Sequence, residues 1–318
     1  MNAQPTIGVI VVSYNTAALL GACLDSLAAC MLPLRIVVVD NASADGSAAL
    51  VRERYPHVEL IALEANAGYA GGTNTGLEAL QLECAAAADY VLVLNPDTEV
   101  VPGAIETLAD FLAHHPRVGM VGPRLLNRDG SLQTAAFRFP TLLMSLFDLF
   151  PPGEVLPGRF YGSWWHGRYP QETGAAPFAI DHPLGACMLL RSAVVCEVGG
   201  MDASYFMYSE EVDWCWRIKQ AGWAIWQVPA AEVFHVGGAS TSQFRWNMFV
   251  ALYRSRARFV ARYYSPGRRR AYQWIVRLGI VRLILASWLE YRRGRLDHTA
   301  LRAQLLAYGQ VLQINAAG

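Results

Sequence analysis

This sequence of 318 residues has no two closely spaced cysteines of the kind that bind metals or form redox motifs. Its six cysteines include no Cys-x-x-Cys pair and stand mostly among apolar neighbours, which predicts reduced core residues of a cytoplasmic protein. The first residues carry no basic segment, and the apolar run at 7–12 is too short for a signal peptide or a membrane span. Export is therefore not predicted.

Charge is also scarce, at 16% of residues against 53% apolar, which is typical of a folded, soluble-type protein. Acids are nearly absent from residues 251–302, which contain 13 arginines but only Glu290 and Asp297. Residues 1–250 have the opposite excess, with 24 acids against 12 arginines and Lys219. The C-terminal part thus forms a distinct basic surface, suited to nucleic acid, anionic lipid or a polyanionic substrate.

Apolar strands alternate with helices along the first part of the chain. The expected strands lie at 7–13, 34–39, 58–63, 90–94 and 118–121. This alternation predicts right-handed crossovers and a parallel sheet. Farther on, we expect strands at 185–191 and 223–228, a strand-to-loop junction around His235, and helices at 192–198, from 210 onward, at 244–265 and at 272–289.

The strand at 90–94 is followed at once by Asn95, Pro96 and Asp97. Proline cannot donate to a ladder, so pairing should end there and leave Asp97 at the carboxyl edge, where open parallel sheets bind ligands. A carboxylate with an amide two residues before it suits a hard divalent cation that also holds a diphosphate. A simple Pro-Asp turn is the alternative.

A glycine-rich stretch at 66–76 is expected to open a helix. Its glycines would let backbone amides approach a ligand, or would only permit close helix packing. No lysine follows the last glycine, and the spacing is not that of the dinucleotide fingerprint, so two common nucleotide motifs are excluded. Residues 124–182 lose periodicity; their aromatics and arginines could stack on sugars and contact phosphate, or Trp164 and Trp165 could form a loop core.

A second acidic cluster, Glu210, Glu211 and Asp213, begins the helix that Ser209 is expected to cap. Glu211 shares a helix face with three apolar residues, Trp214, Cys215 and Ile218. We therefore expect Glu211 to turn inward, whereas Asp213 lies on another face and has Arg217 one turn later as an ion-pair partner. Acids that merely decorate a helix start are the alternative.

The segment 272–289 is strongly apolar but contains Arg277 and Arg282. Two arginines inside it predict a helix that lies on a membrane rather than one that spans it. The alternative is that its apolar residues, Ile275, Leu278, Ile284 and Leu285, simply pack on the catalytic domain.

Seven ordered motifs between about residues 7 and 240 together resemble one known family. They are the segments 11–15, 39–47, 66–76, 94–97, 185–189 and 210–217, and His235 with Gly238 and Ser240. In these motifs the chain resembles the family 2 inverting glycosyltransferases, and among them bacterial rhamnosyltransferase-like members. The resemblance implies an α/β GT-A (Rossmann-like) fold, with a mixed, mostly parallel sheet flanked by helices and a helical C-terminal extension.

The resemblance also implies a division of the chain. Residues 1–243 would form the catalytic domain, and 244–318 the arginine-rich helical extension. Within the catalytic domain, the nucleotide-sugar-binding half would cover about 1–123, and the acceptor-binding half about 124–243.

Site residues follow from the same resemblance. Asp40 would bind the nucleoside of the donor, and Asp97 with His235 would hold Mg²⁺ or Mn²⁺. Glu211 would be the general base, with Asp213 as its rival. The expected donor-binding set is Ser13, Asn15, Asp40, Asn66, Gly68, Asn74, Asn95 and Asp97.

The sequence departs from the family pattern at two positions. Asn95 replaces the first Asp of the family's DxD motif, which leaves open how strictly a metal is needed. Glu211 stands where Asp is usual, which keeps Asp213 open as the base.

The implied reaction moves rhamnose or another hexose from a dTDP- or UDP-sugar to a saccharide or polyprenyl-diphosphate-linked acceptor, in cell-surface polysaccharide synthesis. The chemistry needs a metal to neutralise the leaving diphosphate and a carboxylate to take the acceptor proton. A cytoplasmic enzyme at the inner face of an anionic membrane is expected, and no nucleic acid partner. A non-catalytic nucleotide-sugar-binding protein and a nucleotidyltransferase are the alternatives.

Overall fold

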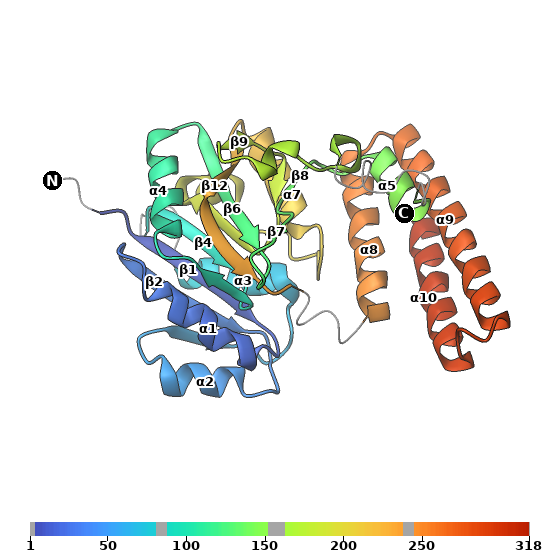
Figure 1. Cartoon of the computed structure of the whole chain (residues 1–318), viewed down its shortest axis with the longest axis horizontal. Helices are drawn as coiled ribbons and strands as arrows, with labels where there is room; N and C mark the ends of the chain where they lie inside the picture. Colours follow the sequence, from blue (N-terminus) through green and yellow to red (C-terminus); the bar gives the residue numbers. More distant parts are fainter. Residues whose placement is uncertain (1–3, 81–87, 152–162, 238–244, 318) are drawn as a thin grey trace. The chain divides into compact units, whose positions relative to one another are not determined.

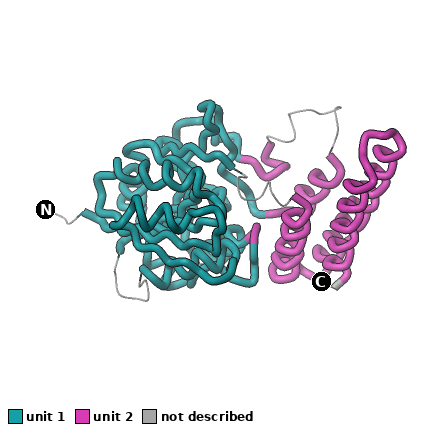
Figure 2. The backbone as a smooth tube through the Cα atoms, turned by 90° about the horizontal axis from the view of Figure 1, so that it is seen from below, with its two compact units in different colours: residues 1–139, 169–206, 210–240 teal, residues 140–168, 207–209, 241–318 magenta. Residues whose placement is uncertain are grey.

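The computed structural model describes residues 4–80, 88–151, 163–237 and 245–317. The chain forms two compact units (Figure 2). Unit 1 comprises residues 1–139, 169–206 and 210–240, and unit 2 comprises 140–168, 207–209 and 241–318. Unit 2 therefore takes in two internal segments besides the predicted C-terminal extension. Cys84, Gly238 and Ser240 lie outside the described residues.

Unit 1 begins with four parallel strands, as the alternating pattern predicted. β1 (Ile7–Ser13) pairs with both β2 (Leu34–Asp40) and β4 (Tyr90–Leu94), and β3 (Glu59–Ala62) adds to β2. β1 and β4 are buried along their whole length, because Val, Ile and Leu can fill both faces of a covered sheet. All four strands run the same way and end at one edge.

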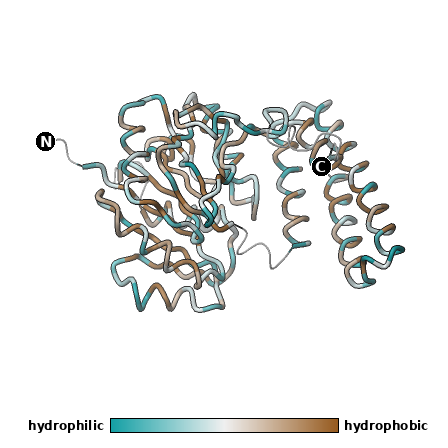
Figure 3. Tube along the Cα trace, viewed as in Figure 1, coloured by the Kyte–Doolittle hydropathy of each residue, from teal (hydrophilic) through white to brown (hydrophobic). Residues whose placement is uncertain are grey.

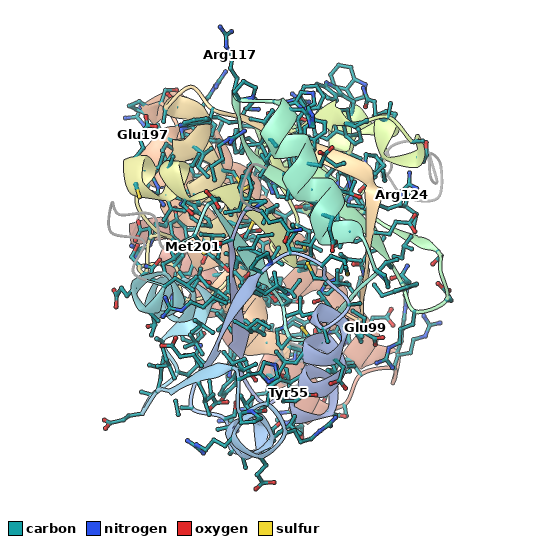
Figure 4. All side chains as sticks on the ribbon, turned by 90° about the vertical axis from the view of Figure 1, so that its left-hand side faces the viewer. Tyr55, Glu99, Arg117, Arg124, Glu197 and Met201 are labelled. Atoms are coloured by element: carbon teal, nitrogen blue, oxygen red, sulfur yellow. The ribbon has the colours of Figure 1, made fainter. Side chains whose placement is uncertain are left out.

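Helices cover both faces of this sheet (Figure 1). One apolar layer contains residues of α1 (Ala17–Leu27), α2 (Ser47–Arg54) and α4 (Ala104–His114). The other contains residues of α3 (Gly68–Ala79), α6 (Ser192–Val198) and α7 (Glu210–Gln220). Tyr55, labelled in Figure 4, joins α2 to α1 because its hydroxyl donates to the Gly21 carbonyl (3.0 Å) and the Asp25 carboxylate (2.8 Å).

The remaining strands make the sheet mixed. β11 (Cys187–Arg191) runs antiparallel between β4 and β6 (Val118–Leu126), β12 (Ala224–His235) lies parallel to β6, and β5 (Thr98–Val100) is antiparallel to β12. The main order is β3-β2-β1-β4-β11-β6-β12-β5. Short strands complete unit 1: β7 (Leu132–Gln133), β8 (Ala136–Phe137), β9 (Phe178–Ala179) and β10 (His182–Pro183), with the 3₁₀ turn η2 at Pro170–Thr173.

Two strands are longer than the sequence indicated. β6 does not stop before Gly122 and Pro123 but continues through both, since Pro123 opposes Val228 of β12. β12 is one strand where two elements were expected, because a register shift between Val228 and Glu232 keeps it in the sheet. The shift brings His235 to the end of β12.

The glycine-rich stretch is largely helix rather than loop. Gly68 begins α3 with φ of 75°, and a side chain there would collide with the Phe206 carbonyl. Gly72 and Gly76 lie inside the helix, close to the side chains of Val12 and Ile10 on β1. The interpretation as close helix–sheet packing therefore holds for these two glycines.

Unit 2 is helical. It contains α5 (Leu142–Leu149), the 3₁₀ turn η1 (Trp164–His166), α8 (Arg245–Tyr263), α9 (Pro266–Arg292) and α10 (His298–Ala317). The last of these, α10, lies within the expected helical extension, although its bounds were not predicted. α10 packs against both α8 and α9 (Figure 1), around a core that includes Tyr253, Val276 and Val311. Arg256 of α8 pairs with Asp148 of α5 (2.9 Å).

Two expectations about unit 2 meet different outcomes. Trp164 and Trp165 are 43% and 61% exposed, so the loop core proposed beneath them is wrong. α9 is the one helix, within the described ranges, whose length and composition would allow it to cross a membrane.

Candidate functional site

The loops after β1 and β2 interlock through hydrogen bonds. The Asn41 amide donates to the Ser13 carbonyl (2.8 Å), and the Asn15 amide donates to the Ser43 hydroxyl (2.9 Å). In return, the Asn15 side-chain oxygen accepts from the Ala44 amide (2.8 Å). Asn15 has φ of 53°, a left-handed conformation that Asn tolerates better than most residues. Ser13 and Asn15 thus brace the loop that follows Asp40.

Asp40 ends β2 with only one of its carboxylate oxygens engaged. Its Oδ2 accepts from the Ser43 amide (3.0 Å), while Oδ1 is buried and has no hydrogen-bond partner among the described residues. The side chain is 3% exposed. A buried acceptor without a hydrogen-bond partner costs free energy, so this oxygen is suited to accept a hydrogen bond from an N–H group of a bound molecule.

Asn66 and Asn74 both bond to the protein itself. The Asn66 side-chain oxygen accepts from the Gly68 amide (2.9 Å) and so fixes the start of α3. Asn74 donates to the Met201 carbonyl (2.8 Å) and accepts from the Met201 amide (2.9 Å). Met201 is buried in unit 1 (Figure 4). Asn74 therefore holds the turn before Met201, and its expected contact with the donor stays a prediction.

Asp97 and His235 meet at the ends of β4 and β12, as predicted for one edge of the sheet. Asp97 Oδ1 lies 3.4 Å from His235 Nε2, and Asp97 Oδ2 accepts from the Gly237 amide (3.1 Å). Both side chains are 8% exposed. Gln133 of β7, which sequence reasoning missed, accepts at Oε1 from His235 Nδ1 (2.7 Å). The Gln133 amide nitrogen in turn donates to Asn127 Oδ1 (3.1 Å), which fixes the side chain in this orientation.

This arrangement fits a divalent cation. With its Nδ1–H donated to Gln133, His235 presents Nε2 to the Asp97 carboxylate, and an imidazole nitrogen beside a carboxylate oxygen is a ligand pair that a divalent cation accepts. The described residues hold no cluster of three or more His, Cys, Asp or Glu that could bind a metal alone. Two protein ligands are enough when a diphosphate and water supply the others.

One short segment, Gly185–Ala186, connects the two acidic positions. The Asn95 amide donates to the Ala186 carbonyl (2.8 Å), which ties the segment to the loop that carries Asp97. A Cβ built on Gly185 would lie 3.5 Å from Cγ of Glu211, so Gly185 packs directly on that side chain. The hydroxyl of Tyr69 donates to the Gly185 carbonyl (2.7 Å). The loop that carries Asp97 and the side chain of Glu211 therefore both contact the same piece of backbone.

The neighbourhood of Glu211 is acidic and poorly solvated. Burial raises the pKa of Glu211, which is half-buried. Burial also raises the pKa of Tyr69, and the charges of Glu210 and Glu211 raise it further. A carboxylate held above its usual pKa beside an open glycine backbone is the arrangement expected of a general base.

Asp213 forms the predicted ion pair with Arg217 (2.9 Å), but it is not turned outward as expected. Its side chain is fully buried, more deeply than that of Glu211. Arg217 explains this, because it accompanies Asp213 and also donates to the carbonyls of Val198 (2.8 Å) and Gly200 (2.6 Å). Asp213 is therefore engaged in holding α7 to the turn after α6.

The model of the family described as Glycosyl transferase family 2 matches residues 8–198, which include the loops after β1, β2 and β4. The chain belongs to this family. N-acetylglucosaminyl-diphospho-decaprenol L-rhamnosyltransferase of Mycobacterium tuberculosis is 32% identical over 276 residues, covering 85% of this chain and 88% of the relative. The low-salt glycan biosynthesis hexosyltransferase Agl10 of Haloferax volcanii is 30% identical over 202 residues, covering 63% and 58%.

Solved structures agree on the fold of this family 2 glycosyltransferase. The mannosyltransferase PcManGT of Pyrobaculum calidifontis, solved with GDP-Man and Mn²⁺, superposes with a TM-score of 0.55 at 18% identity, covering 99% of this chain and 85% of that one. The predicted GT-A fold, with its mixed, mostly parallel sheet and helical C-terminal part, is confirmed. The chain is a nucleotide-sugar-dependent glycosyltransferase of a family that typically inverts.

Proposed function

We propose that this chain transfers rhamnose, or another hexose, from a dTDP- or UDP-sugar to a saccharide or polyprenyl-diphosphate-linked acceptor with inversion. The observation that carries the proposal is the Gly185–Ala186 segment, which is bonded to the Asn95 loop and packs on Glu211. This arrangement supports a single site in which the leaving diphosphate would meet Asp97 and the acceptor hydroxyl would meet Glu211.

The donor nucleoside would bind at Asp40. Its unpartnered Oδ1 supports this role, because uracil and thymine both present an N3–H that a carboxylate can accept. The loops braced by Ser13 and Asn15 hold that oxygen in place. The side chain of Asn41 is hydrogen-bonded to the backbone at the start of α3, where Asn66 accepts from the Gly68 amide, so these residues lie beside Asp40. A pyrimidine nucleoside is therefore the proposed base of the donor.

Asp97 and His235 would hold Mg²⁺ or Mn²⁺ at the diphosphate. When bound, the metal neutralises the charge that builds on the leaving nucleoside diphosphate. Gln133 keeps the His235 imidazole turned toward Asp97. Asn95 replaces a second carboxylate, so its half-buried amide would contact the diphosphate or its metal without adding charge.

Glu211 would take the proton from the acceptor hydroxyl. Its raised pKa supports this role, since a carboxylate with a higher pKa is a stronger base and accepts the proton more readily. The hydroxyl oxygen then attacks the anomeric carbon opposite the departing diphosphate, which inverts the configuration. A nucleophilic side chain is not needed. Asp213, paired with Arg217, would orient α7 rather than exchange protons.

The acceptor proposal rests on the relative from Mycobacterium tuberculosis, whose name specifies a diphospho-decaprenol-linked sugar and rhamnose transfer. A lipid-linked acceptor would place this enzyme in the cytoplasm at the inner face of a membrane, where synthesis of a cell-surface polysaccharide would begin. An anionic membrane surface is the matching partner for an arginine-rich unit 2.

Turnover of labelled nucleotide sugars tests the proposal. We expect transfer from dTDP-rhamnose or a UDP-hexose to a GlcNAc-diphospho-polyprenol analogue, with Mn²⁺ or Mg²⁺ and release of a nucleoside diphosphate. Release of pyrophosphate would instead identify a nucleotidyltransferase. Donor binding without any product, detected as a rise in melting temperature, would support a non-catalytic nucleotide-sugar-binding protein.

A further inference from the structure

Helix α9 exposes a continuous row of large apolar side chains, here called the α9 stripe. Its members recur every three or four residues and therefore share one helix face. The row extends about 22 Å along the axis at 1.5 Å per residue. The exposed fractions are Trp274 59%, Leu278 57%, Val281 47%, Leu285 60%, Trp288 46% and Leu289 53%.

The opposite face of α9 is already used within unit 2. Tyr272, Val276 and Ile280 are buried in its core, and Gly279 lies against Leu149 of α5 so closely that a Cβ would collide with it. Ile275 and Ile284 pack partly buried against this core of unit 2. Leu278 and Leu285 do not. The core of unit 2 therefore leaves the α9 stripe uncovered.

Arginines of α9 lie near the α9 stripe, whereas the one acid of this helix does not. At about 100° per residue, Arg270 and Arg292 fall within about 50° of the stripe's mean direction, one beyond each end. Arg277 lies on its flank, with its guanidinium 5.4 Å from the Trp274 ring centre. The one acid of α9, Glu290, points about 150° away at the same helical spacing and pairs with Arg293 (3.2 Å).

We propose that the α9 stripe is the face by which this protein docks on an anionic lipid surface, with α9 lying in the plane of the interface. The apolar residues would enter the boundary between headgroups and acyl chains, with a Trp near each end at headgroup level. Arg270, Arg277 and Arg292 would contact lipid phosphates.

Two other arrangements fit these observations less well. If a second copy of the chain packed its own stripe on this one, arginines would face arginines in both the parallel and the antiparallel arrangement of the two helices. A spanning helix would carry Arg277 and Arg282 into the hydrocarbon and would withdraw the inner face of α9 from its core. Arg282 donates through Nε to the Leu149 carbonyl (2.8 Å), a contact that holds α9 within unit 2.

This inference deepens the proposed function, because docking along α9 would bring the enzyme to a lipid-linked acceptor. It can still fail separately from the reaction. Vesicle binding is measured without donor, metal or acceptor, whereas transfer can be measured with a soluble acceptor analogue. Loss of one result therefore leaves the other standing.

Cosedimentation of the full chain with vesicles tests the inference. We expect binding to phosphatidylcholine mixed with phosphatidylglycerol, weak binding to phosphatidylcholine alone, and release by salt. The double variant Leu278→Glu/Leu285→Glu should lower partitioning at least tenfold. Its control is Met31→Glu, the same kind of apolar-to-acid substitution at a side chain of unit 1 that is 81% exposed. This control should leave vesicle partitioning unchanged.

A second pair of variants tests the charges without touching apolar residues. Arg270→Gln/Arg292→Gln should lower binding to the anionic vesicles by about fivefold for each arginine removed, the scale for one basic residue near a charged surface. The matched control Arg52→Gln/Arg117→Gln removes two exposed arginines of unit 1 and should bind like the wild type.

Two outcomes would overturn the inference. One is equal vesicle binding by the wild type and both α9 variants. The other is a wild-type dimer in sedimentation velocity that becomes monomeric in Leu278→Glu/Leu285→Glu while neither form binds vesicles; the stripe would then be an interface between copies.

Discussion

The two units treat charge in opposite ways. Unit 1 buries carboxylates and gives each a defined neighbour, as with Asp97 beside His235 and Asp213 beside Arg217. Unit 2 carries most of the chain's arginine excess and leaves apolar residues of α9 exposed. Buried, oriented charge is what a reaction needs, whereas exposed charge beside apolar surface is what docking needs. The difference supports the proposals that unit 1 carries out the reaction and that unit 2 attaches the enzyme to a lipid surface.

The largest expected effect breaks unit 1 alone. Asp97→Ala removes one proposed metal ligand, so transfer should fall by about 10³-fold or more, the scale of several kcal/mol of lost charge stabilisation. Mn²⁺ binding in the presence of UDP, followed by the EPR signal of free Mn²⁺, should weaken with it. Asn95→Ala should cost less, and vesicle binding should not change in either variant. Normal turnover by Asp97→Ala would remove this residue from the site.

Glu211→Gln should have the next largest effect. The amide keeps the size of the side chain but cannot take a proton, so kcat should fall by roughly 10²-fold or more while donor affinity persists. Glu211→Asp should be milder. In the wild type, kcat should rise with pH through the raised pKa of Glu211, because only the carboxylate is active.

Asp213→Asn is the decisive comparison for the base. It breaks a buried ion pair, so its main effect should be a lower free energy of unfolding. The kcat per folded molecule should change little. If Glu211→Gln turns over normally and a folded Asp213→Asn is inactive, the two roles are reversed.

Gln133→Leu sharpens the view that unit 1 orients its ligands. Without an acceptor for Nδ1–H, the His235 imidazole loses its fixed tautomer, so Mn²⁺ affinity should fall about 10- to 100-fold, the range for such supporting contacts. Gln133→Glu is the matched control, because it retains that acceptor and should bind Mn²⁺ at least as well as the wild type. Equal affinity in all three proteins would exclude the proposed role of Gln133 in orienting His235.

The sequence predicted best what depends on local pattern. The strands at β1, β2 and β4, the helix α7 and the Asp213–Arg217 spacing all follow from periodicity within a few residues. The placement of Asp97 at a strand end followed from Pro96. These features do not require knowledge of which distant segments meet.

Features set by distant contacts were not predictable in the same way. Gln133 lies 102 residues from His235, in a two-residue strand without a distinctive pattern. The burial of Asp213 depends on the carbonyls of Val198 and Gly200, which accept from Arg217. The glycines of α3 are compatible in sequence with ligand binding or with packing, and only the contacts of Gly72 and Gly76 with β1 identify the packing role of these two.

A substitution in unit 2 should affect its packing without affecting the chemistry of unit 1. Gly279→Ala adds a Cβ 2.6 Å from the Leu149 Cβ, and this overpacking should lower the free energy of unfolding by about 1–2 kcal/mol after the gain in helix propensity. Gly309→Ala in α10 meets nothing within 4 Å, so it should raise stability by about 0.5–1 kcal/mol. Urea unfolding followed by circular dichroism measures both, and equal signs would contradict the close contact of α5 with α9.

The smallest expected effect concerns the cost of keeping Glu211 in its place. Burial raises its pKa in the folded chain above the unfolded value, so between these two pKa values the folded chain binds more protons. Stability that the protonated form provides is then lost as pH rises through this window, and the loss is complete above the folded pKa. Glu211→Gln cannot ionise and escapes this loss. In the absence of metal and donor, its Tm should match the wild type at low pH and exceed it above the window. Asp213→Asn, which deprives Arg217 of its partner, should instead melt below the wild type at neutral pH.

A Glu211→Gln variant that is inactive yet more stable would mean that unit 1 tolerates a less stable fold to hold its base. A variant that is inactive and less stable would instead give Glu211 a structural role and reopen the choice of base.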